Sequence, residues 1–157
     1  IGEPQSDKTR FAELPAAREE AQQVAKVLGA PALIGADALQ VINALLAKPL
    51  RIVHIAGHGM PPNDGNARGV VLSNNTFLGP AEIESMRVVP ELVFINCCHL
   101  GRADDQALLN AQYDRVRFAS GVAAALIKIG VRCVAGSERT YRYRRALFLR
   151  QISSFGV

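Results

Sequence analysis

The sequence predicts a single α/β domain with a mainly parallel sheet and helices on both of its faces. Two observations indicate this class. Apolar, β-branched runs alternate along the chain with segments of helical spacing, and near-continuous apolar strands of this kind are typical of parallel sheets. In addition, 157 residues with 49% apolar and 20% charged content suffice for one substantial core and are too few for two ordinary domains.

Two helices are predicted first. Residues 14–30, "LPAAREEAQQVAKVLGA", end at Gly29 and place five apolar side chains at helical spacing: Ala17, Ala21, Val24, Ala25 and Leu28. Residues 36–49, "ADALQVINALLAKP", have Asp37 as the expected N-cap and Pro49 as the stop. On this second helix we expect one apolar face formed by Leu39, Ile42, Leu45 and Leu46.

Three buried strands are predicted, over residues 50–59, 91–98 and 131–136. Between the first two, "VVLSNNTFL" indicates a hairpin, with Asn74 and Asn75 suited to left-handed turn positions. Pro80 marks the start of a short helix. A last helix is expected from Ser120 to Gly130, and we expect Cys133 on the final strand to fill the core.

Two of these strands end in residues that suit nucleophilic chemistry. Functional groups collect beyond the carboxyl ends of parallel strands, and His58 and Cys97–Cys98 stand at such ends, 40 residues apart from His58 to Cys98. A cysteine attacks as the thiolate, and a nearby imidazole can take its proton. Gly59 would let a substrate carbonyl approach the backbone, so that its N–H could join an oxyanion hole. The spacing leaves Cys97 and Cys98 as equal candidates.

Metal binding is the main alternative. His54 and His58 are four residues apart on one strand, and Cys97, Cys98 and His99 would add soft donors. Adjacent strand residues point to opposite faces, however, and no Cys-x-x-Cys or His-x-x-x-His helix is present, so we predict no metal and no cofactor. We expect His54, in mid-strand, to be a hydrogen-bonded structural residue.

Charge and cysteine usage restrict the setting and the partners. The net charge of +4 comes from residues 138–150, where five arginines face one glutamate. Without a Gly-rich or aromatic-stacking module, this basic stretch does not predict direct nucleic-acid binding. No apolar run reaches the roughly 18–20 residues that cross a bilayer, so we expect no membrane partner. Adjacent cysteines cannot form an ordinary disulfide framework, which indicates a reducing setting, taken to be the cytoplasm.

The order of these segments resembles the CHAT family of caspase-like cysteine peptidases, in the clan of caspases, separase and gingipains. The resemblance rests on "RIVHIAGHG" followed by "LVFINCCHLG", with the helix at 14–30 before them and "VLSNNTFLGPAEIESM" between them. It implies a caspase-like three-layer sandwich. The family's histidine and glycine fall on His58 and Gly59, and its cysteine on Cys98, with Cys97 as the preceding small residue and Gly101 as the following glycine.

The resemblance implies a cysteine endopeptidase that cleaves a protein or peptide substrate with His58 and Cys98. The backbone N–H groups of Gly59 and Cys98 would form the oxyanion hole. It further implies a regulated bacterial defence or signalling protease, joined to a helical-repeat or regulatory region. Residues 1–157 are then a single, partial domain of this kind, since the chain starts without Met and residues 137–157 form an atypical basic tail without Trp. That tail keeps open the alternative of a catalytically silent, caspase-like interaction domain.

Overall fold

The computed structural model describes residues 1–47, 49–60, 68–86, 88–98, 122–131 and 133–136. For Cys98 and residues 133–136 it describes the backbone but not the side chains. Several predicted features lie outside this part of the chain: His99, Gly101, Ser120, the side chain of Cys133 and the basic tail at 137–157.

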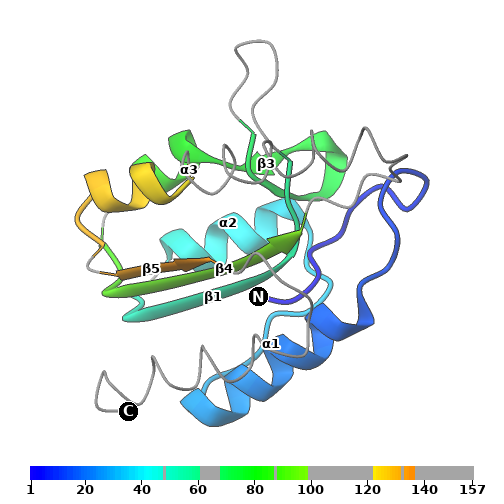
Figure 1. The fold of residues 1–157 in the computed structure, drawn as a ribbon, viewed down its shortest axis with the longest axis horizontal. Helices are drawn as coiled ribbons and strands as arrows, with labels where there is room; N and C mark the ends of the chain where they lie inside the picture. Colours follow the sequence, from blue (N-terminus) through cyan, green and yellow to red (C-terminus); the bar gives the residue numbers. More distant parts are fainter. Residues whose placement is uncertain (48, 61–67, 87, 99–121, 132, 137–157) are drawn as a thin grey trace.

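A parallel sheet of three strands forms the centre of the fold (Figure 1). Its order is β1 (Ile52–His58), β4 (Leu92–Cys98) and β5 (Cys133–Gly136), so the three predicted buried strands are confirmed. The start of the chain continues the sheet beyond β1, because Gly2 forms parallel bridges to Ala56 on one side and to Ile34 on the other. The sequence pattern did not predict this extension.

Helix α1 (Pro15–Leu28) has the predicted boundaries and lies on one face of the sheet (Figure 1). Pro15 occupies its first turn, where the missing N–H costs no hydrogen bond. Gly29 ends it in the left-handed conformation with φ of 59°. Ala17, Ala21 and Val24 are its buried residues.

Helix α2 (Ala38–Leu46) lies on the opposite face and begins at the predicted N-cap. The side chain of Asp37 accepts the Gln40 N–H, and the Gln40 side chain accepts the Asp37 N–H, which forms a capping box. The predicted apolar face was wrong in part, since Leu39 and Leu46 are 68% and 43% exposed. Leu45 is buried and Ile42 is partly buried, as predicted. Val41 is buried as well, because the helix is rotated so that Val41 and Leu45 face the sheet.

The predicted hairpin and short helix are both present. Strands β2 (Val70–Val71) and β3 (Phe77–Leu78) pair antiparallel around a short 3₁₀ turn, η1 (Ser73–Asn75). Asn74 and Asn75 both have φ of 56°, the left-handed conformation predicted for them. Helix α3 (Pro80–Glu84) begins at Pro80. Residues 122–128 are helical, and Gly130 follows with φ of 101°.

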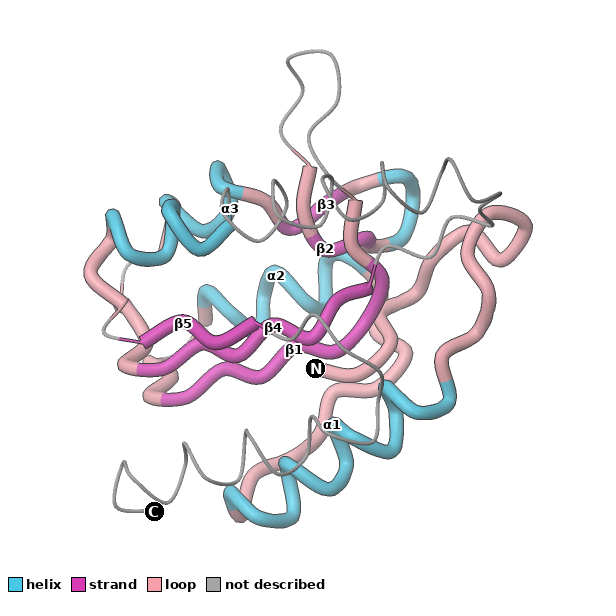
Figure 2. Tube along the Cα trace, in the orientation of Figure 1, coloured by secondary structure: helices cyan, strands magenta, loops and turns pink. Residues whose placement is uncertain are grey.

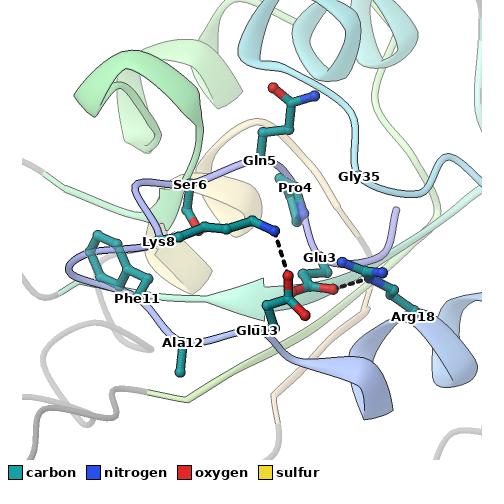
Figure 3. Close-up of a pocket in the computed structure, with 10 residues that line it drawn as sticks. All are labelled: Glu3, Pro4, Gln5, Ser6, Lys8, Phe11, Ala12, Glu13, Arg18 and Gly35. Atoms are coloured by element: carbon teal, nitrogen blue, oxygen red, sulfur yellow. Dashed lines mark hydrogen bonds and ion pairs between the residues drawn. The ribbon is translucent and has the colours of Figure 1, made fainter.

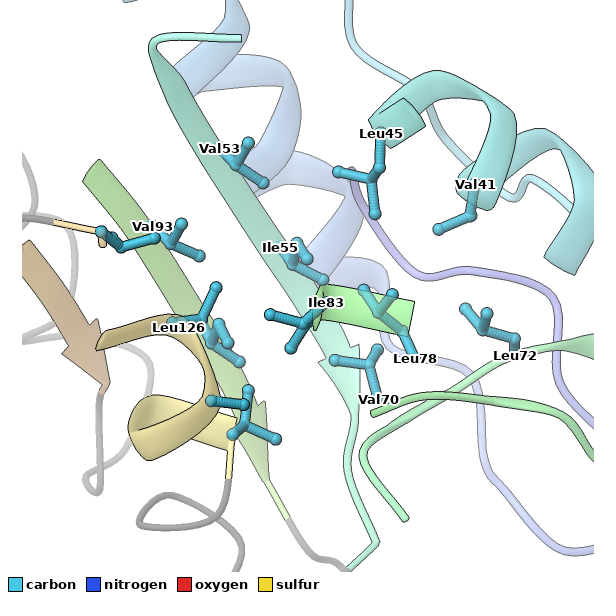
Figure 4. Packing of buried hydrophobic residues seen from close by; sticks show 14 of the residues in the cluster. Val41, Leu45, Val53, Ile55, Val70, Leu72, Leu78, Ile83, Val93 and Leu126 are labelled. Carbon is cyan, nitrogen blue, oxygen red and sulfur yellow. The ribbon is translucent and has the colours of Figure 1, made fainter. Parts of the chain in front are cut away.

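The two faces of the sheet differ in chemistry. The face toward α2 and the hairpin is apolar, and its side chains form one cluster with α2, β2, β3, α3 and the helix at 122–128 (Figure 4). The face toward α1 carries Phe94 but also three buried polar side chains: His54, His58 and Asn96. A sheet ordinarily buries apolar side chains, so the polar ones on this face need hydrogen-bond partners, which are described below.

Helices thus cover both faces of a parallel sheet, an arrangement compatible with the predicted caspase-like fold (Figure 2). Across the described residues, we find no helix with the length and apolar content that crossing a membrane requires.

Candidate active site

The predicted dyad residues are register partners on neighbouring strands. His58 on β1 pairs with Cys98 on β4, and both are the last residues of their strands. Neighbouring strands lie about 4.8 Å apart, and partners in a parallel register belong to the same face of the sheet. The fold therefore brings the backbone positions of His58 and Cys98 together at the carboxyl edge of the sheet.

The neighbouring cysteine belongs to the other face. Cys97 pairs with Gly57, and its partly buried side chain packs against the apolar cluster on the α2 side. Strand pleating then assigns position 98 to the α1 side, the face of His58. The geometry thus distinguishes two residues that chain spacing alone left equivalent.

The imidazole of His58 is held in one orientation by the segment before α1. Its Nε2 lies 2.7 Å from the carbonyl oxygen of Ala12, and the ring centroid of Phe11 is 5.2 Å away. A carbonyl can only accept, so Nε2 carries the proton and donates it. In this neutral tautomer the lone pair is on Nδ1, which makes Nδ1 the nitrogen that can accept a proton. His58 itself is 5% exposed.

Sequence reasoning missed the contributions of Phe11 and Ala12. A backbone carbonyl can come from any residue type, so the identity of Ala12 contains no signal for this role. Phe11 follows a polar stretch, and nothing in its spacing relates it to a histidine 47 positions later.

A second polar group lies deeper on the same face. Glu20 of α1 accepts from His54 Nε2 at 2.8 Å and from Asn96 Nδ2 at 2.6 Å, so its carboxylate links α1 to both β1 and β4. His54 also stacks on Phe94, with ring centroids 5.3 Å apart. Burial lowers the pKa of His54, and the hydrogen bond and charge of Glu20 oppose this effect. His54 is the hydrogen-bonded structural residue that its mid-strand position predicted.

The described side chains around His54 and His58 do not provide a set of metal ligands. Within the described part of the chain, no group of three or more His, Cys, Asp or Glu side chains could hold a metal ion. The Nε2 atoms of His54 and His58 bind different partners, Glu20 and Ala12. The other donors considered for a metal, the Cys98 and His99 side chains, lie outside the description.

Gly59 connects the sheet to the hairpin. It forms an antiparallel bridge with Val70, and the next residue, Met60, donates its N–H to the Gly69 carbonyl at 2.9 Å. The hairpin therefore begins directly beside the end of β1. The bridge to Val70 fixes the backbone of Gly59 beside the end of β1.

A comparison with protein families gives one match. The model of the CHAT domain matches residues 1–144, which include every described element and both dyad positions. The chain belongs to the CHAT domain family. This CHAT domain is accordingly related to caspase-like cysteine peptidases, as the order of its motifs predicted. Searches of curated proteins and of solved structures found no match.

Proposed function

We propose that this CHAT domain is a cysteine endopeptidase in which Cys98 is the nucleophile and His58 the base. The observation that supports this most directly is the parallel register, in which His58 and Cys98 are partners at the carboxyl ends of neighbouring strands. Family membership supplies the reaction class, and the hydrogen bond from His58 to Ala12 supplies an oriented base.

The proposed reaction begins with transfer of the Cys98 thiol proton to His58 Nδ1. The thiolate attacks the carbonyl carbon of the scissile peptide bond, and the resulting imidazolium returns the proton to the leaving amine. Water, deprotonated by His58, then attacks the thioester and releases the acid and the free thiol. The Ala12 carbonyl favours this cycle because it accepts a hydrogen bond from Nε2–H throughout and stabilises the imidazolium.

The backbone N–H groups of Gly59 and Cys98 are the proposed donors to the oxyanion. Both residues stand at the strand ends where the substrate carbonyl would have to bind. Donors aimed at a developing oxyanion typically contribute about 100-fold or more to the rate. The mechanism requires no metal or cofactor.

The proposed substrate is a protein or peptide, and the proposed setting is the cytoplasm of a bacterium, in defence or signalling. A helical-repeat or regulatory region, in the same chain or a partner, would control the activity. These parts of the proposal rest on the family resemblance.

Thiol labelling and peptide cleavage test the dyad, and the adjacent cysteine provides a matched control. We expect Cys98→Ala in the full chain to abolish cleavage of a peptide library and to remove the fast phase of iodoacetamide labelling. His58→Ala should slow labelling, since the thiol then lacks its base. Cys97→Ala removes a thiol one residue away on the core face and should leave both readouts close to those of the unaltered chain.

Labelling of Cys98→Ala at the rate of the unaltered chain would show that another thiol is the reactive one. Cleavage that survives both Cys98→Ala and His58→Ala would refute the dyad. If the unaltered chain cleaves no peptide in the library and its Cys98 thiol labels slowly, the silent interaction domain is the correct reading.

A further inference from the structure

We infer that Glu3 is a positioning residue for this reaction, because its buried carboxylate sets the Ala12 carbonyl that orients His58. The inference rests on the proposed function, since it assigns His58 the role of base. Glu3 is far from His58 and Cys98 in sequence, and it lies outside the two motifs "RIVHIAGHG" and "LVFINCCHLG".

The Glu3 carboxylate holds the start of α1. It accepts the backbone N–H of Leu14 at 2.7 Å and forms an ion pair with Arg18 (Figure 3). Leu14 is the N-cap residue of α1, and its own side chain makes no capping hydrogen bond. Glu3 therefore accepts the N–H of the N-cap residue, as the N3 side chain does in a capping box, and its negative charge suits the positive end of the helix.

The same residue is fixed to β1 through its backbone. The N–H of Glu3 donates to the carbonyl of Ala56 at 2.8 Å, two residues before His58. Ala12, two residues before Leu14, accepts from His58 Nε2. The loop from Glu3 to Leu14 is thus attached to β1 at two nearby points, and the Glu3 carboxylate joins the two ends of the loop.

Two features show that this arrangement has an energetic cost. Glu3 is 7% exposed, and removing a carboxylate from water is unfavourable, a cost that the Leu14 N–H and Arg18 offset in part. Its φ of 43° is in the left-handed region, which a residue with a side chain adopts at a cost. Buried charge and backbone strain at one position are typical of sites where geometry serves function, and the adjacent feature with a proposed function is the base His58.

A second ion pair in the same loop provides the contrast. Glu3 and Arg18 line a cavity of about 350 Å³, which Lys8 and Glu13 also line (Figure 3). Lys8 and Glu13 form an ion pair as well, but their side chains are 72% and 54% exposed. Glu13 lies next to Ala12 in sequence, and its carboxylate pairs with Lys8. Removing it tests whether any charge loss in the loop has the effect expected of Glu3.

The consequence for catalysis is a choice of tautomer. With the Ala12 carbonyl in place, the proton of neutral His58 stays on Nε2 and the lone pair stays on Nδ1. If Leu14 and Ala12 shift, the proton can move to Nδ1, and the base is lost for part of the molecules. A wrong histidine tautomer or a misplacement of about 1 Å typically costs about a hundredfold or more in rate.

The test is Glu3→Gln in the full chain, read by ¹⁵N NMR of labelled histidine and by kinetics. In the unaltered chain we expect His58 to show the Nε2–H pattern, with its signals assigned through His58→Gln. In Glu3→Gln we expect a mixture of tautomers and a kcat at least about tenfold lower, with KM changed less than about twofold. Glu13→Gln should keep the Nε2–H pattern and the kcat of the unaltered chain.

Signals of His58 in Glu3→Gln identical to those of the unaltered chain would overturn the inference, whatever the activity. A tautomer change in a chain without peptidase activity would instead support the positioning role and refute the proposed function. If Glu3→Gln does not fold, Glu3→Asp decides, since it keeps the charge but shortens the side chain by one methylene and so withdraws the carboxylate from the Leu14 N–H. A tautomer shift in that variant supports the inference, and unchanged His58 signals overturn it.

Discussion

Removal of the Glu20 carboxylate should strongly destabilise the fold, because one side chain of α1 accepts hydrogen bonds from two strands. In Glu20→Ala, His54 Nε2 and Asn96 Nδ2 lose their acceptor. His54 and Asn96 are 6% and 1% exposed. Each buried donor that loses its partner costs about 1–3 kcal/mol, which gives about 2–6 kcal/mol for two. The Glu20 side chain is 13% exposed, so water can partly replace it, and we expect a loss of about 3 kcal/mol.

Urea unfolding followed by circular dichroism measures this loss. With slopes of about 1–3 kcal/mol per molar urea, the midpoint should fall by about 1–3 M. Glu19→Ala is the matched control, because Glu19 is exposed on the same helix and the substitution changes helix propensity equally. Unfolding free energies of the two variants that agree within about 0.5 kcal/mol would refute the reasoning, since the buried hydrogen bonds would then contribute nothing.

Two further predictions concern stability. Burial keeps the pKa of folded His54 below its usual 6.5. At acidic pH the unfolded chain therefore binds a proton at this histidine more readily than the folded chain does. The His54 contribution to the free energy of unfolding should be fully present above about pH 6.5 and decrease as the pH falls below it. In His54→Gln, the urea midpoint should therefore depend less on pH across this range than in the unaltered chain. On α2, Leu45→Ala should cost about 2–5 kcal/mol and Leu39→Ala less than about 0.5 kcal/mol, since the side chains are 7% and 68% exposed. Equal midpoints for the two leucine variants would contradict the observed packing of α2.

Local signals explain why most elements could be predicted. Pro15 and Gly29 bound α1, and Asp37 starts α2, because each acts on backbone groups within one or two turns of itself. Asn74 and Asn75 form the hairpin turn since their side chains tolerate the left-handed region better than most. These interactions need no information from the rest of the fold.

The apolar face of α2 shows where local signals end. Leu39, Val41, Ile42, Leu45 and Leu46 offer two overlapping apolar faces on one short helix. Helical spacing fits either face, so the sheet against which the helix packs selects Val41 and Leu45. In the same way, no pattern indicates that residues 1–3 extend the sheet beyond β1, because their short polar-flanked segment has no strand periodicity.

The sequence by itself determined the succession of strands and helices, the family, and the candidate pair His58 with Cys97 or Cys98, because these depend on residue types and on spacing along the chain. Only the tertiary structure decided that His58 and Cys98 are register partners and that Ala12 accepts a hydrogen bond from His58 Nε2. It also decided that Glu3 and Glu20 form hydrogen bonds with distant strands. Register and backbone hydrogen bonds arise between segments far apart in the chain. Their energies depend on the folded geometry, and the identity of a single residue does not encode them.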